Sequence, residues 1–186
     1  MLWPLAIGFG LLLGIAGGGS LSHLTRLKFR WPWLLVAAVV VRDIVIFSPL
    51  SRVEGAQYVY TVSLALIVLW TVWHLKLLPG VWLVTAGGVL NLVVVLANAG
   101  RMPVAPDLAS SQLAGALNQR GHIGQYTLMG PDTHLNWLGD WVALRPLPEA
   151  YSPGDLLIAI GIALVILVTL HRRPESDGVI EKPENV

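Results

Sequence analysis

The stretch at residues 98–155 decides how this chain can fold. It opens with NAGRMP (residues 98–103), passes through HLNWLGDW (residues 134–141) and closes with SPGD (residues 152–155). It is the only long segment that is not strongly apolar, and apolar runs flank it on both sides. We therefore expect an all-α membrane protein in which a polar cap, residues 98–152, lies on one face of a helical bundle.

The composition sets the class of protein. Of the 186 residues, 55% are hydrophobic and 12% are charged, and the mean hydropathy is +0.68. A soluble domain carries about 25% charged residues, so this chain has too little charge to cover a surface that faces water. The net charge of +1 gives no basic field for nucleic acid, and the lack of cysteine excludes disulfides, thiolate zinc sites and cysteine nucleophiles.

Five apolar runs predict five transmembrane helices in a single domain, residues 1–173. The expected spans are residues 2–19, 31–48, 56–73, 80–97 and 153–170. Aromatic residues mark span ends, as they do in membrane proteins; the third run has Tyr58 and Tyr60 at one end and Trp70 and Trp73 at the other. The polar residues 174–186 are expected to form a disordered cytoplasmic tail.

The Lys and Arg residues predict the orientation, because positive charge gathers on the cytoplasmic side of membrane proteins. Five spans with an outer N-terminus place Arg26, Lys28, Arg30, Lys76, Arg172, Arg173 and Lys182 in the cytoplasm, against Arg52, Arg101, Arg120 and Arg145 outside. The N-terminus and the cap are therefore expected outside the plasma membrane, and the C-terminus in the cytoplasm.

A stripe of small residues lies on the first span. Gly10, Gly14 and Gly18 recur every four residues and so share one helical face, where they let another helix approach closely. Two interpretations stay open. The stripe is a seam for a homo-oligomer or another membrane protein, or it packs against a neighbouring helix of the same chain.

Arg42 and Asp43 interrupt the second run. A charge in hydrocarbon costs about 2.5–3.5 kcal/mol on insertion scales, so each of them needs a partner or a route to water. In one interpretation Arg42 or Asp43 reaches the cap. In the other, Arg42 extends outward to the interface and Asp43 binds a local donor.

Polar residues in the fourth and fifth runs have structural and functional interpretations. Asn91 and Asn98 share one helical face, and such residues either join helices by hydrogen bonds or contact a ligand; ligand contact applies chiefly to Asn98, beside the cap. Ser152 and Asp155 flank Pro153 in the S-x-x-D pattern of a capping box. Two interpretations of Asp155 therefore remain open: it caps the last helix, or it has a catalytic role.

The cap is expected to contain short interfacial helices, because long loops without structure are uncommon. Pro106 and Asp107 begin the first of them and Gly121 ends it. A second helix begins at Asp132 and places the Leu, Trp and Val side chains of residues 135–142 on one face.

No strong catalytic or metal motif is present. His122, Asp132, His134 and Asp140 are metal-ligand types, but their spacing does not force them to converge, so we expect no metal and no cofactor. A His with an Asp can act as acid and base, yet no serine is marked as the nucleophile.

The Arg residues outside the spans offer a different chemistry. Arg101, Arg120 and Arg145 carry planar forks that bind an anionic head group through paired hydrogen bonds. The alternative for each of these arginines is that it contacts solvent or the phosphates of surrounding lipids without forming a specific site.

Several short pieces carry a resemblance to a known family. They are GGGSL (residues 17–21) with Leu24 and Leu27, WPW (31–33), NAGRMPV (98–104), WLGD (137–140) and YSPGD (151–155). With these pieces in this order, the chain resembles a family of small bacterial integral-membrane proteins known only by a domain-of-unknown-function label. The resemblance implies a helical membrane fold and carries over no catalytic residue. Arg42 and Asp43 lie outside the pattern.

These observations lead to ranked hypotheses about function. The first is a non-enzymatic multipass membrane protein whose outer polar mouth binds a membrane lipid or a partner protein. The second is a membrane enzyme acting on a lipid or isoprenoid substrate at the outer leaflet. A small transporter is third, because no repeat is visible. The candidate polar site comprises Asn98, Arg101, Asp140, His134, Arg42, Asp43, Asn91 and Asp155.

Overall fold

The computed structural model describes residues 2–27, 29–108, 115, 117, 119 and 122–172. Five long helices lie within these ranges: α1 (Leu2–Ala16), α2 (Pro32–Phe47), α3 (Ala56–Trp73), α4 (Val81–Ala97) and α6 (Pro153–Leu170). Each falls inside one of the five predicted apolar runs, so the prediction of a mainly helical chain with five helices is confirmed. The predicted disordered tail and four of the counted cations (Lys28, Arg120, Arg173 and Lys182) lie outside the described residues.

Prolines and glycines define where the helices begin and end. Pro32 and Pro153 occupy the first turns of α2 and α6, where a missing N–H costs no hydrogen bond. α1 ends earlier than predicted, at Ala16, because the chain turns at Gly18 with φ of 82°, a conformation that favours glycine. A short 3-10 helix, η1 (Leu21–Arg26), follows this turn.

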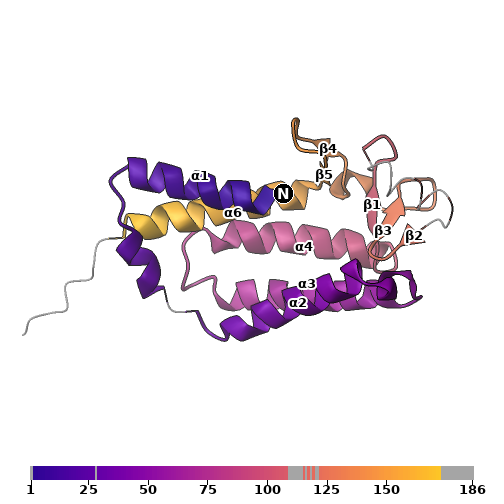
Figure 1. Cartoon of the computed structure of the whole chain (residues 1–186), viewed down its shortest axis with the longest axis horizontal. Coiled ribbons are helices and arrows are strands. Elements are labelled where there is room, and N and C mark those ends of the chain that lie inside the picture. The colour runs from indigo at the N-terminus through magenta and orange to yellow at the C-terminus, as the bar shows by residue number, and fades with distance from the viewer. Residues whose placement is uncertain are drawn as a thin grey trace, which may run out of the picture.

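The helices pack in the order α1, α6, α4, α3 and α2 (Figure 1). They run along the long axis of the molecule, and the small strands gather at one end of the bundle. α2 and α3 form a hairpin closed by the 3-10 helix η2 (Pro49–Arg52). The last helix, α6, lies between the first helix and the fourth, so the final helix in the sequence occupies an interior place in the row.

Glycines allow α6 to approach both of its neighbours. A Cβ atom on Gly10 would lie 2.9 Å from the Ala163 carbonyl oxygen, and one on Gly14 would overlap the Leu170 side chain. Gly10 and Gly14 therefore pack against α6, as in the intramolecular interpretation of the stripe. Gly18 lies beyond the helix, in the turn, with no atom within 4 Å of a Cβ built on it.

The ends of α1 and α6 are joined through histidines. His23 Nδ1 lies 2.8 Å from the Leu170 carbonyl oxygen. Both ring nitrogens of His171 face carbonyl oxygens, Nδ1 that of Leu167 at 2.9 Å and Nε2 that of Gly17 at 3.0 Å. Both contacts are hydrogen bonds only when both nitrogens carry a proton, and these two bonds raise the pKa of His171.

Short strands make up much of the described part of the cap, in which residues 115, 117 and 119 are helical. β1 (Met102–Val104) pairs in parallel with β3 (Tyr126–Leu128), and β3 pairs antiparallel with β2 (His122–Ile123). A separate pair, β4 (Val142–Ala143) and β5 (Ala150–Tyr151), is antiparallel. In Figure 1 these strands cover the end of the bundle to which α4 leads.

The prediction of a helix that begins at Asp132 is wrong. The structure has only one 3-10 turn there, η3 (Asn136–Leu138), and Val142 belongs to a strand. Leu135 has a φ of 53°, which stops a right-handed helix before it. The Asp140 backbone then bonds to β1, so its N–H and C=O are not available to a helix. The other predicted cap helix, from Pro106 to Gly121, lies largely outside the described residues.

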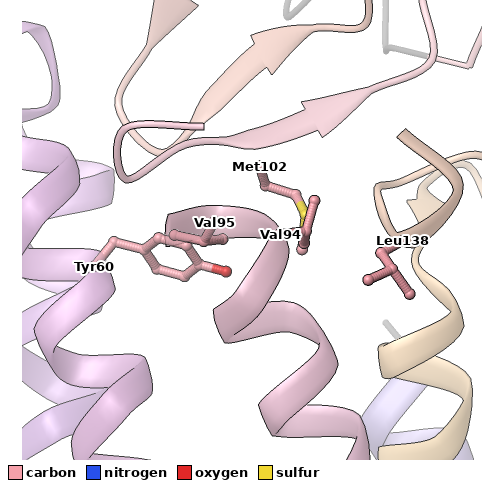
Figure 2. Close-up of a cluster of buried hydrophobic side chains, with 5 residues drawn as sticks. All are labelled: Tyr60, Val94, Val95, Met102 and Leu138. Carbon is pink, nitrogen blue, oxygen red and sulfur yellow. The ribbon is translucent and has the colours of Figure 1, made fainter. Parts of the chain in front are cut away.

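A buried apolar cluster joins the cap to the bundle (Figure 2). Its members come from α3, α4, β1 and η3: Tyr60, Val94, Val95, Met102 and Leu138. Val94 and Val95 are fully buried. Burying side chains of this size contributes about 1.5–3 kcal/mol each, so the cluster fixes the cap to the start of α3 and the end of α4.

Two of these helices meet the length and composition required to cross a membrane, α3 and α6. Helices α1 and α4 are apolar but shorter. Helix α2, the third of the shorter helices, carries Arg42 and Asp43.

Candidate functional site

Asn91 joins α4 to the start of α6. Its Nδ2 donates to Asp155 Oδ1 at 2.9 Å, and its Oδ1 accepts from the Ser152 hydroxyl at 2.8 Å. The predicted capping box is confirmed, because Ser152 Oγ accepts from the Asp155 N–H and Asp155 Oδ2 accepts from the Ser152 N–H. One amide thus binds both side chains of the box, and the three residues form a closed polar network between two helices.

A second amide, Asn98, holds the cap rather than an open mouth. Its Oδ1 accepts from the His134 N–H at 2.8 Å, while its Nδ2 donates to the carbonyl oxygens of His134 and Val94 at 2.8 and 2.7 Å. His134 takes part through its backbone. The structure therefore brings Asn98 and His134 together, but as a tether between the end of α4 and the cap.

Arg101 belongs to a surface ion-pair network. Its Nη2 lies 3.2 Å from Glu54 Oε1, and His122 Nε2 lies 3.4 Å from Glu54 Oε2. The hydrogen bond and charge of Arg101, with His122 adding to them, lower the pKa of Glu54. The network links the α2–α3 loop to the cap, so Arg101 already has a partner within the chain, Glu54.

Asp140 is a buried acid within the cap. Its N–H donates to the Pro103 carbonyl at 2.8 Å, and its carbonyl accepts from the Ala105 N–H at 2.9 Å, so its backbone extends the sheet beside β1. The residue is 8% exposed, and its Oδ1 has no hydrogen-bond partner among the described residues. Burial, with the neighbouring charge of Asp155 adding to it, raises the pKa of Asp140 well above its ordinary value.

Tyr126 shares this environment. Burial raises the pKa of Tyr126 to about 12, and the negative charge of Asp140 acts in the same direction. Arg42 opposes this shift, so its charge also reaches the region beneath the cap. The polar residues under the cap are thus close enough to influence one another.

Arg42 and Asp43 lie in the C-terminal half of α2, toward the cap. Arg42 Nε is 3.8 Å from Asp43 Oδ1, which is too long for a hydrogen bond. The guanidinium carbon lies 5.6 Å from the centroid of the Tyr60 ring, a cation–π distance. Arg42 Nε is buried and has no hydrogen-bond partner in the described part of the chain.

An apolar groove of about 560 Å³ runs between α2 and α3, in the size range of ligand pockets. Small residues make room for it, namely Ala37 and Ala38 on α2 and Ser63 on α3. Larger apolar and aromatic residues complete its lining: Trp33, Leu34, Val41, Tyr58, Val59, Val62 and Leu66. Val41, beside Arg42 in the sequence, lines its outer part.

The eight candidate residues thus fall into separate groups. Asn91 and Asp155 join helices, with Asp140 near them in the cap, while Asn98 and His134 form a tether. Arg101 is paired at the surface. Arg42 and Asp43 lie on α2 outside the groove lining, with the Arg42 guanidinium over the Tyr60 ring. The apolar pattern of the sequence did not reveal the groove. The adjacent alanines of α2, Ala37 and Ala38, are the sequence feature that indicates the groove. In the described ranges, no three His, Asp or Glu side chains are grouped so that they could hold a metal ion.

Comparison with known proteins identifies a family. A sequence profile with the description "Family of unknown function (DUF5317)" matches residues 26–167. That match covers most of the chain, from the end of η1 into α6, and so includes the groove, the polar network and the cap. No curated protein and no solved structure matches the chain.

Proposed function

The chain belongs to the DUF5317 family of unknown function, and we propose that it is a five-span membrane protein that binds a membrane lipid in the groove between α2 and α3. The observation that carries this proposal is the groove itself. It is apolar along its length, and it lies on the side of the bundle.

The surface chemistry supports insertion of all five helices in a bilayer. Apolar side chains stand exposed along the helices, such as Leu12 on α1 and Val36 on α2, and a water-facing protein would aggregate through such surface. Exposed tryptophans lie at both ends of the bundle: Trp33, Trp73 and Trp82 at one end, and Trp137 and Trp141 on the cap. This is the distribution of aromatic belts at two interfaces.

The charges support an outer cap and an inner C-terminus. The end of the bundle opposite the cap carries Arg26, Arg30, Lys76 and Arg172 near the helix ends. The cap end carries acidic residues that balance its cations, including Glu54, Asp107, Asp132 and Glu149. Under the positive-inside rule, the lipid bound at the outer part of the groove comes from the outer leaflet.

The groove suits an acyl chain better than it suits a polar substrate. Nearly all of its lining side chains are apolar, and its two walls are helices whose outward faces also meet the bilayer. The polar residues beneath the cap, in contrast, are engaged with one another, as Asn91 is with Asp155 and Ser152. Lipid binding at the α2–α3 groove therefore replaces the cap mouth as the place where we expect a ligand.

Native mass spectrometry after extraction in mild detergent tests this proposal. The wild-type chain is expected to retain a lipid. Ala37→Trp fills the groove and should abolish the retention, because the new ring occupies the space of the acyl chain. Val36→Trp is the matched control: it adds the same ring one residue away, on an exposed position outside the groove lining. Equal lipid retention by both variants would overturn the proposal.

A further inference from the structure

The end of α6 packs closely against the turn that follows α1, at the end of the bundle opposite the cap (Figure 1). Glycines allow this approach. A Cβ atom on Gly17 would lie 2.8 Å from His171 Nε2, and one on Gly19 would lie 2.8 Å from Leu170 Cβ. The Ser20 N–H donates to the Leu170 carbonyl at 3.0 Å. This glycine-rich turn therefore joins the first helix to the last.

His171 faces two carbonyl oxygens in this junction. Its Nδ1 lies 2.9 Å from the Leu167 carbonyl oxygen on α6, and its Nε2 lies 3.0 Å from that of Gly17, after α1. A carbonyl oxygen only accepts hydrogen bonds, and a neutral imidazole has one N–H. The neutral ring can therefore bond to one of these oxygens and must turn a lone pair toward the other. Only the protonated ring satisfies both.

His23 provides a contrast within the same junction. Its Nδ1 lies 2.8 Å from the Leu170 carbonyl oxygen, and in the described part of the chain this is the one hydrogen bond of the ring. The single N–H of a neutral imidazole is enough to make it. The contact of His23 thus needs no added proton, whereas the two contacts of His171 do.

Few charges surround His171. The two helices that pack on α6, α1 and α4, contain no ionisable side chain. On η1 the described titratable group is His23, and no carboxylate lies in that segment. Arg172, the next residue, donates to the Leu77 carbonyl at 3.4 Å. Carbonyl oxygens and the negative end of the α6 dipole therefore stabilise the protonated ring, without an acidic partner from these segments.

We propose that His171 is a proton-operated clasp, which ties the end of α1 to α6 when its ring is protonated and loosens that end when its ring is neutral. The two carbonyl contacts raise the pKa of His171 above its ordinary value. The stabilisation is therefore fully present below about pH 6.5 and is lost as the pH rises through the raised pKa. The clasp does not depend on the groove or on what binds there.

Hydrogen exchange, measured by mass spectrometry on the chain in detergent, tests the clasp. Protection of residues 14–20 is compared at about pH 6 and about pH 8, after correction for the chemical exchange rate. The wild type is expected to lose about three- to tenfold of this protection at the higher pH, the size of one hydrogen bond. Residues 91–98, at the cap end of α4, are the internal reference, and their protection should not respond to substitution of His171.

Three variants separate the proton from the ring. His171→Gln should give low protection at both pH values, because its amide carries no charge. His171→Lys should keep the protection at the higher pH, because its ammonium stays charged and donates to carbonyl oxygens. His23→Gln is the matched control: it removes the neighbouring contact between an imidazole and a carbonyl, and it should leave the pH dependence in place.

Nitrogen NMR of the histidine rings gives a direct second measurement. The His171 signal is identified by its loss in His171→Gln and is expected to titrate above about pH 6.5. Titration at or below that value would overturn the clasp. So would a pH dependence of protection that persists in His171→Gln, or one that disappears in His23→Gln.

Discussion

Asp140 shows how a single residue can act against the stability of the folded chain. It is buried, its Oδ1 has no hydrogen-bond partner in the described residues, and the charge of Asp155 is near. Its backbone, in contrast, is fully engaged with β1. The sheet therefore fixes the position of this acid, and the side chain keeps a proton there because ionisation without a partner in a buried site is costly.

The pH dependence of stability follows from the raised pKa of Asp140. An aspartate in the unfolded chain ionises at about pH 4, whereas the folded protein holds the proton to higher pH. Below about pH 4, Asp140 is protonated in both the folded and the unfolded chain, and the stability linked to its raised pKa is fully present. That stability is lost as the pH rises through the raised pKa. Tyr60 and Tyr126 also lie near this acid.

Asp140→Asn should therefore stabilise the protein at neutral pH, because it keeps the shape of the side chain and removes the charge. We expect the melting temperature to rise by about 2–4 °C for each kcal/mol gained, and to fall less steeply with pH than in the wild type. Thermal unfolding in detergent between about pH 4 and pH 8 measures this. Asp132→Asn, at an exposed cap residue, is the control and should have no such effect. A melting temperature lowered by Asp140→Asn at neutral pH would contradict the prediction.

Arg42 and His74 show what a residue's position in the sequence leaves undecided. Arg42 was expected to need a partner, and its guanidinium lies over the Tyr60 ring. His74 is fully buried, with Nε2 accepting from the Arg30 N–H at 3.1 Å and its ring stacked 3.9 Å from that of Trp70. The contacts of Arg42 with Tyr60 and of His74 with Arg30 join residues far apart in the sequence, which spacing alone does not reveal.

At the scale of elements, the contact between α4 and α6 depends on glycine. A Cβ atom on Gly154 would overlap Asn91 Oδ1 and lie 2.6 Å from the Gly87 carbonyl oxygen. A Cβ on Gly161 would lie 2.7 Å from the Val84 backbone nitrogen. The helices approach closely enough for Asn91 to reach the capping box of α6 only because these positions lack side chains.

Gly154→Ala should consequently destabilise the protein, because the added methyl group forces α4 and α6 apart and disturbs the bonds of Asn91. We expect a loss of about 1–3 kcal/mol, typical of overpacking. Gly8→Ala is the matched control, since a Cβ at Gly8 meets nothing within 4 Å and alanine favours a helix. Chemical unfolding of both variants in the same detergent measures the difference. Equal stability of the two variants would show that the close approach is not required.

At the scale of the whole molecule, the five helices form one row with the cap at one end (Figure 1). The buried cluster of Figure 2 joins that cap to α3 and α4, so the cap and the bundle form one unit. Positive charges lie near the helix ends opposite the cap. This arrangement allows the topology to be tested at positions on both ends.

Labelling of intact cells with a membrane-impermeant maleimide tests the five spans and their orientation. The chain has no cysteine, so each single substitution reports one site. Val53→Cys and Asp132→Cys should be labelled from outside, because the α2–α3 loop and the cap face outward. Thr25→Cys and Lys76→Cys should react only after lysis. Labelling of Lys76→Cys in intact cells, or recovery of the protein without detergent, would contradict this topology.

The sequence by itself determined the five helices and the start of α6. Long apolar runs form helices because all backbone hydrogen bonds are satisfied within the segment, and Ser152, Pro153 and Asp155 provide a local cap. Of the candidate residues, Asn91 and Asp155 meet in the folded chain, whereas Asn98 and Arg101 bond to the cap and the α2–α3 loop.

Only the tertiary structure decided that the cap pairs as strands, that Asp140 is buried without a partner for its Oδ1, and that a groove opens between α2 and α3. The physical reason is that helices depend on neighbours three and four residues away, which a sequence displays directly. Strand pairing, burial and grooves depend on segments that meet only after the chain has folded. Val104 and Asp140 are one such pair, far apart in sequence and bridged in the folded cap.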